Sequence, residues 1–379
     1  MLHRALPALA AVALLFAPVT AEAGTVVAAE PRAAAAGQEI LRKGGSAADA
    51  AMAVMLALTV TEPMSSGIGG GGFLLHHDGK TGKLETVDGR ETAPASAGHD
   101  RFLGADGKPL PYMQAVPGGY SVGIPGNIAL MAETHKRWGK LPWAKLFEPA
   151  IRLAEQGYTL LPDNKPGPFA VQGTLAYRLK QFEKLWADFP EARAIYWKDG
   201  RPLTTGETVR NPALAATLRT IAAKGPDAFY KGEIASQISQ AVGRSKRNPT
   251  TLTVGDLSAY RAKLRAPVCG TYRGHRICGM GLPSSGAITD LMMLGMLERF
   301  DLAKLGKDSP VAWHLIGEAM RLAYADRDAW LGDSDFVKVP VAGLLDPAYL
   351  AERSKLISPD KTLGSYPPGT PPGATPLAM

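Results

Sequence analysis

The strongest constraint on the fold of this chain is the ordered set of helix and turn signals in residues 44–94. Near its start a Gly-Gly pair, which suits the end of a helix, precedes Ser46. Asp49 follows three residues later, and a serine and an acidic residue at this spacing can cap each other's backbone amides. We therefore predict that a helix begins after Ser46 and continues to Val60. Its residues are apolar on nearly every side, so this helix is expected to be buried.

A glycine-rich loop follows, and its Gly67-x-Gly69-x-x-Gly72 spacing matches the dinucleotide-binding fingerprint. That fingerprint requires a strand before the loop and a helix after it. Here the order is reversed, since a helix precedes the loop and strands are predicted at 73–77 and 83–87. We interpret the loop as a tight backbone turn that glycine permits.

The remaining segments mix helices with short strands and lack a regular alternation, which predicts an α/β or α+β fold. Further helices are expected at 32–43, 127–138, 143–156, 212–224, 226–242, 288–300, 312–331 and 347–356, and a hairpin at 268–280.

Arg90 is the first candidate binding residue, because the segment Asp88 to Pro94 follows the predicted strand 83–87 directly and places Arg90 where the strand end meets a loop. A guanidinium at a strand end can form paired hydrogen bonds with a ligand carboxylate. The residues alone favour a structural role, in which Arg90 forms an ion pair with Asp88 or Glu91.

Ser121 is a competing candidate, since residues 119–123 have the Gly-x-Ser-x-Gly spacing of a hydrolase nucleophile elbow. Such an elbow needs a strand immediately before the serine and a helix immediately after it. Proline and glycine flank the motif on both sides, and the next helix is expected only near Asn127. A loop serine is therefore favoured, and a serine hydrolase acting through Ser121 is kept as the alternative.

Metal, cofactor and nucleic-acid functions have little support. The adjacent His76 and His77 would point to opposite faces of a strand, and neither His-Glu-x-x-His nor Cys-x-x-Cys spacing occurs. We expect no metal site and no cofactor. The formal charge of +7 comes from scattered residues rather than from one patch, so no nucleic-acid partner is expected.

Residues 30–357 resemble the γ-glutamyltransferase family, also called glutathione hydrolases, over the large subunit or N-terminal part of the precursor. The resemblance rests on four motifs in residues 44–94, namely 44–51, 61–63, 67–73 and 88–94, and on four further segments. These are Pro149 to Tyr158, Gly225 to Gly232, Pro283 to Gly286 and Tyr324 to Arg327.

The resemblance implies the N-terminal-nucleophile hydrolase fold, an αββα four-layer sandwich, of which this chain would form the large-subunit portion. It also implies that Arg90 binds the α-carboxylate of a γ-glutamyl group, with Glu91 and Thr92 as supporting candidates. No catalytic residue is expected in this chain, because the family's nucleophilic threonine opens a small subunit. Thr375 precedes Pro376 rather than the Thr-His that family nucleophiles favour, so it is a poor candidate.

The small catalytic subunit is therefore the expected protein partner. Glutathione or another γ-glutamyl compound is the expected substrate, with water or an amino acid as acceptor. A related acylase activity and an inactive remnant remain as alternatives.

Three regions are expected along the chain. Residues 1–23 have the basic start, apolar stretch and small-residue cleavage site of a secretory signal. Residues 24–357 form the large-subunit domain, and the Pro- and Gly-rich residues 358–379 are expected to be an extended, mobile tail before the processing site. The mature protein is expected to be periplasmic or secreted, with no membrane span after signal cleavage.

Cys269 and Cys278 are the only cysteines. If the hairpin turns at Arg273-Gly274, the two cysteines face each other at a distance that permits a disulfide. A one-residue bulge at the same turn would instead separate them and leave two free thiols. Both outcomes are left open.

Overall fold

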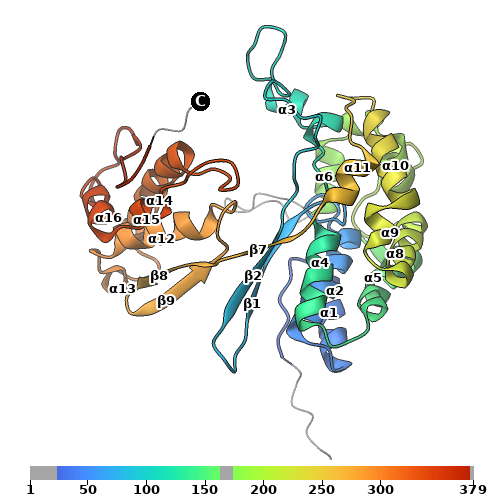
Figure 1. Cartoon of the computed structure of the whole chain (residues 1–379), viewed down its shortest axis with the longest axis horizontal. Helices are drawn as coiled ribbons and strands as arrows, with labels where there is room; N and C mark the ends of the chain where they lie inside the picture. The colour runs from blue at the N-terminus through green and yellow to red at the C-terminus, as the bar shows by residue number, and fades with distance from the viewer. Residues whose placement is uncertain (1–23, 163–173, 376–379) are drawn as a thin grey trace, which may run out of the picture.

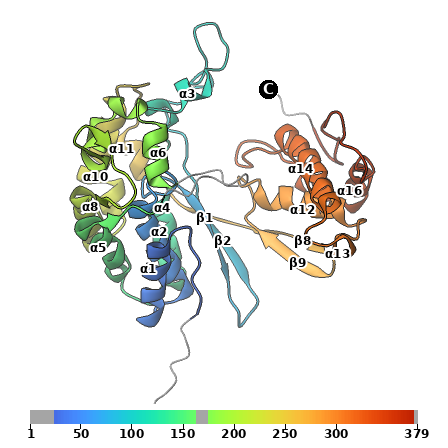
Figure 2. The ribbon, with the colours of Figure 1, turned by 180° about the vertical axis from the view of Figure 1, so that it is seen from behind.

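The computed structural model describes residues 24–162 and 174–375, so the expected signal at 1–23 lies outside the described residues. Figure 1 shows two helical lobes on either side of a sheet of three strands. These are β1 (Gly72–His77), β2 (Leu84–Gly89) and β7 (Lys263–Arg265), and β2 lies in the middle. Both pairings are antiparallel. Figure 2 shows the same arrangement from behind.

The first lobe is built around helix α2 (Ala47–Thr61), which follows α1 (Pro31–Arg42). The expected capping box is present, because the Ser46 hydroxyl accepts the Asp49 N–H at 3.0 Å and the Asp49 carboxylate accepts the Ser46 N–H at 2.9 Å. Helix α2 is buried along most of its length, as its apolar sequence predicts. It lies in the largest hydrophobic cluster of the described residues.

The other helices of this lobe cover α2 and one another (Figure 1). They are α4 (Asn127–Trp138), α5 (Glu148–Gln156), α6 (Leu175–Gln181), α7 (Pro190–Tyr196), α8 (Pro212–Lys224), α9 (Asp227–Tyr230), α10 (Gly232–Gly243) and α11 (Val254–Ala259). Short two-stranded pairs join some of these segments: β3 (Tyr158–Thr159) with β6 (Thr208–Val209), and β4 (Trp197–Lys198) with β5 (Arg201–Pro202).

The second lobe has its own hydrophobic cluster, formed mainly by α12 (Gly286–Leu297), α14 (Pro310–Trp330) and α16 (Pro347–Ser354). The shorter helices α13 (Leu302–Leu305) and α15 (Val341–Leu344) complete it. Apolar side chains of α12 and α14 interlock, with Met292, Met296 and Leu322 almost fully buried. Among the described residues, each lobe thus has its own main hydrophobic cluster, and the sheet lies between the two lobes (Figure 1).

The hairpin β8 (Val268–Tyr272) and β9 (His275–Gly279) resolves the cysteine question. Its turn residues Arg273 and Gly274 both have positive φ, at 48° and 79°, as a two-residue type I′ turn requires. Cys269 therefore lies directly opposite Cys278, and the two form a disulfide. The bulged alternative with free thiols does not occur.

Two predicted helices are divided in the structure. Residues 143–156 form a 3₁₀ turn (Trp143–Phe147) that leads into α5, and residues 226–242 are split between α9 and α10. The second break lies at Lys231 and Gly232, where Gly232 has a φ of +71°. Such a left-handed conformation interrupts a helix, which explains why the continuous prediction was wrong.

Residues 358–375 contain no helix or strand, but they do not form the free tail expected from their composition. The Leu363 N–H and the Tyr366 hydroxyl both donate to Glu318 of α14. The Gly369 N–H donates to Asp326 of the same helix at 2.7 Å. Sequence composition missed this anchoring because the acceptors are two buried carboxylates on a distant helix.

No helix of the described residues is long and apolar enough to cross a membrane.

Candidate functional site

Arg90 lies immediately after β2, and its backbone is fixed on both sides. Its N–H donates to the Asp88 carboxylate at 2.8 Å, and its carbonyl accepts the Tyr260 hydroxyl at 2.6 Å. Its side chain is 58% exposed and carries one contact, from Nε to Glu91 Oε2 at 3.3 Å. The guanidinium therefore starts from a rigid position and still has free donors for a ligand.

This arrangement partly matches the structural alternative for Arg90. The ion pair with Glu91 forms, but Asp88 does not pair with the Arg90 guanidinium. The second Asp88 oxygen instead accepts Nε of Arg265 at 3.0 Å. Asp88 thus fixes the backbone of Arg90 and does not form an ion pair with its guanidinium.

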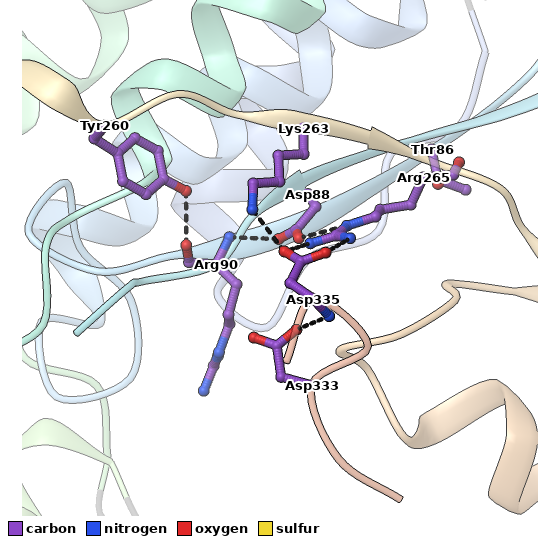
Figure 3. A network of polar contacts seen from close by, with 8 residues as sticks. All are labelled: Thr86, Asp88, Arg90, Tyr260, Lys263, Arg265, Asp333 and Asp335. Atoms are coloured by element: carbon purple, nitrogen blue, oxygen red, sulfur yellow. Dashed lines mark hydrogen bonds and ion pairs between the residues drawn. The ribbon is translucent and has the colours of Figure 1, made fainter. Parts of the chain in front are cut away.

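Arg265 connects this strand to the second lobe through a network of ion pairs (Figure 3). Its two Nη atoms donate to the two Asp335 oxygens at 2.6 and 2.7 Å. Lys263, two residues earlier on β7, donates to the same carboxylate at 2.6 Å. The Asp333 carboxylate in turn accepts the Asp335 N–H at 2.9 Å. In Figure 3 the Arg90 side chain extends away from this network.

The cationic side chains of the network keep the Asp335 carboxylate ionised. Hydrogen bonds from Arg265 and then from Lys263 hold the pKa of Asp335 well below its usual range. Asp335 raises the pKa of Arg265 in return. Burial raises the pKa of Tyr260, so its hydroxyl remains a donor to the Arg90 carbonyl.

Arg90, Glu91 and Thr92 line one pocket of about 760 Å³. Thr92 forms an isolated antiparallel bridge with Ile124, and residues 120–123, just before Ile124, line the same pocket. The structure therefore brings together all three of the substrate-binding candidates from the sequence, as well as Ser121.

The glycine loop packs behind this pocket. A Cβ atom on Gly71 would lie 2.5 Å from Glu91 Oε2 and 2.6 Å from the Gly89 carbonyl oxygen. Only glycine allows the loop and the Arg90 segment to approach this closely. As expected, helix α2 precedes the loop and strand β1 follows it, so the geometry differs from that of a dinucleotide fingerprint.

Ser121 does not have the geometry of a nucleophile elbow. It ends a 3₁₀ turn (Gly119–Ser121) with no strand directly before it, and the next helix begins only at Asn127. Its hydroxyl donates to the backbone carbonyl of Val116, and the Gly118 carbonyl oxygen lies 3.3 Å from the same hydroxyl. The serine is thus part of a loop, as the flanking residues indicate.

The histidine pair adds no metal site to this region. His76 stacks on Trp138 of α4, with ring centroids 4.3 Å apart. Within residues 24–162 and 174–375, no group of three or more His, Cys, Asp or Glu side chains is arranged to hold a metal ion.

Sequence reasoning did not single out Tyr260, Lys263, Arg265 or Asp335. The alternation of Lys263 and Arg265 would place both on one face of a strand, which was the one available signal. Nothing in the sequence connects that face with Asp335, seventy residues away.

Comparison with known proteins shows the family of this chain. The family model for gamma-glutamyltranspeptidase matches residues 33–375. The glutathione hydrolase proenzyme of Bacillus subtilis (strain 168) is 39% identical over 338 residues, or 89% of this chain and 55% of that protein. The glutathione hydrolase proenzyme of Escherichia coli (strain K12) is 40% identical over 336 residues, with coverage of 88% and 55%.

Among solved structures, the gamma-glutamyltranspeptidase of Helicobacter pylori superposes with a TM-score of 0.82 at 34% identity. The match covers 91% of this chain and 94% of the solved chain. The fold is therefore that of the N-terminal-nucleophile hydrolases, as the motifs imply. Within that class, the chain belongs to the γ-glutamyltranspeptidase family, and it spans about 55% of the length of the two curated relatives.

Proposed function

We propose that this chain is the large subunit of a γ-glutamyltransferase that cleaves γ-glutamyl bonds in glutathione and related compounds. The glutamyl group would pass to water or to an amino acid. The observation that carries the proposal is the state of Arg90, whose backbone is held by Asp88 and Tyr260 while its guanidinium stays exposed in a pocket. A fixed, exposed guanidinium suits recognition of a carboxylate.

In this proposal Arg90 pairs with the α-carboxylate of the glutamyl group. Glu91 contacts Nε of Arg90 and so limits the orientations of the guanidinium, and Thr92 adds a hydroxyl to the same wall. Glu91 and Thr92 thus support Arg90 rather than take part in bond cleavage.

The nucleophile would be a threonine of the small subunit. Its hydroxyl attacks the γ-carbonyl carbon while its own α-amino group takes the proton. The amine of the leaving group departs with a proton, and water or an amino acid then releases the acyl group. In the family, this chain's share of the reaction is to anchor and orient the substrate.

The test is steady-state kinetics of the complex with its small subunit, with release of glutamate as the signal. We expect Arg90→Ala to raise KM for γ-glutamyl donors roughly thirtyfold, as loss of about 2 kcal/mol of carboxylate binding requires. Arg90→Lys should restore only part of this, because one ammonium cannot replace a two-pronged contact. An unchanged KM in Arg90→Ala would return Arg90 to a purely structural role.

Activity assays of this chain with and without its small subunit distinguish a γ-glutamyltransferase subunit from a serine hydrolase and from an inactive remnant. We expect residues 24–379 without a small subunit to release no glutamate, because the nucleophile is absent. Activity that Ser121→Ala abolishes would favour a serine hydrolase. A complex that stays inactive with every γ-glutamyl or acylase donor would favour an inactive remnant.

We also propose that the protein is exported to the periplasm or the medium. The apolar start of the sequence and the Cys269–Cys278 disulfide support this, since disulfides persist in oxidising compartments.

A further inference from the structure

Arg101 is a second guanidinium in the pocket that contains Arg90. Its Nε donates to the Tyr120 carbonyl at 2.8 Å, and its Nη2 reaches the Gly119 carbonyl at 3.4 Å. The guanidinium carbon also lies 5.8 Å from the centre of the Tyr120 ring. The side chain is therefore oriented by three neutral groups.

No carboxylate of the described residues forms an ion pair with Arg101, and within these residues its hydrogen bonds are made by Nε and Nη2. Arg90, by comparison, has Glu91 beside it. Carbonyl groups and an aromatic ring orient this half-buried guanidinium without supplying a countercharge. The pocket thus contains an oriented cation, the Arg101 guanidinium, that is not paired with a carboxylate of the described residues.

The support around Arg101 is rigid enough to define a binding position. Phe102 packs edge-on against Tyr120, with ring centroids 6.5 Å apart. The following turn is closed by a bridge between Leu103 and Pro109. Arg101 therefore projects from a braced loop rather than from a free one.

We propose that Arg101 binds a second carboxylate of the donor, on the leaving-group side of the γ-glutamyl bond. This inference rests on the proposed function, in which Arg90 takes the α-carboxylate. Planar guanidinium groups form charge-assisted, often paired hydrogen bonds to carboxylates, and stacking on an aromatic ring leaves the edge of the guanidinium available for them.

The size of the pocket agrees with such a donor. Its volume of about 760 Å³ falls in the range of small-molecule sites, roughly 300 to 1,000 Å³. An extended peptide advances about 3.5 Å per residue, so the two terminal carboxylates of a tripeptide lie on the order of 10 Å apart. The substrate class is therefore a γ-glutamyl peptide with a free C-terminal carboxylate, rather than a γ-glutamyl amide with a neutral leaving group.

The test uses the complex with its small subunit and two matched donors, glutathione and glutathione amidated at its glycine carboxyl. We expect Arg101→Ala to raise KM for glutathione roughly 10- to 100-fold, as loss of a charge-assisted hydrogen bond implies. KM for the amidated donor should stay within about twofold of wild type. Arg101→Lys should raise KM for glutathione less than Arg101→Ala does, because lysine keeps the positive charge but lacks the planar guanidinium that pairs with both carboxylate oxygens.

Arg210→Ala is the matched control. Arg210 is exposed, donates to the backbone carbonyl of Gln156 and lies outside this pocket, so its removal should change neither KM. Turnover of the amidated donor by Arg101→Ala also shows that the variant is folded.

Two results would overturn the inference: an equal rise in KM for both donors in Arg101→Ala, or no change in either. They differ from failure of the proposed function. In that case the wild-type complex would turn over neither donor, or Arg90→Ala would leave both KM values unchanged.

Discussion

Replacing Arg265 by Met tests whether the ion pair between Arg265 and the buried Asp88 carboxylate stabilises the fold. The Asp88 side chain is only 7% exposed, and Arg265 is its one cationic partner among the described residues. Breaking a buried ion pair by removing one partner costs about 3 to 5 kcal/mol, because the other charge stays buried. Asp88 keeps the N–H of Arg90 as a donor, so we expect the lower end, about 3 kcal/mol.

Lys263→Met is the matched control, because Lys263 contacts the same Asp335 carboxylate from an exposed position. Its side chain is 51% exposed, and exposed pairs contribute about 0 to 1 kcal/mol. The assay is urea unfolding of residues 24–379, followed by circular dichroism and tryptophan fluorescence. With an m-value of about 3 kcal/mol/M, the Arg265 variant should unfold about 1 M earlier and the Lys263 variant at most about 0.3 M earlier.

A double variant, Arg265→Met with Asp88→Asn, separates loss of the pair from loss of packing. The neutral amide needs no countercharge, so the double variant should be more stable than Arg265→Met alone. Equal shifts of the two single variants would contradict a stabilising Arg265–Asp88 pair, and so would a double variant that is no more stable than Arg265→Met.

Two further predictions concern acid stability and the cysteines. Because Arg265 and Lys263 lower the pKa of Asp335 in the folded state, its stabilisation is complete above the ordinary value of 3.8 and is lost as the pH falls below it. The difference in unfolding midpoint between wild type and Asp335→Asn should therefore narrow as the pH falls from about 5 to about 2.5, and a constant difference would contradict the assigned pKa. The Cys269–Cys278 disulfide predicts that exported protein, denatured without reductant and treated with an alkylating agent, takes up no label by intact mass, whereas two labels would show free thiols.

Much of the fold was predictable because its signals are local. The capping residues Ser46 and Asp49 determine where α2 begins, and the facing cysteines follow from a two-residue turn at Arg273-Gly274. In each case the sequence within about ten residues contains the physical cause.

The rest depended on contacts between distant segments. Arg90 was identifiable from its motif. Its backbone is fixed by Tyr260 directly and by Arg265 through Asp88, and these two residues lie about 170 residues further along the chain. Helices α6 and α7 were not predicted at all, since their short sequences carry weak periodicity and are stabilised by tertiary packing. Arg101 was missed because an arginine in a polar loop looks like any solvated residue until its neutral partners are seen.

The anchoring of residues 363–369 on α14 makes this segment a reporter for the second lobe. Ser365 is exposed between the two residues whose groups donate to Glu318, so a spectroscopic label there would move with α14 rather than independently. A second label on exposed Gln237 of α10 would follow the first lobe. The distance distribution between the two labels would then measure how stiffly the ion pairs of Arg265 couple the two halves of the molecule.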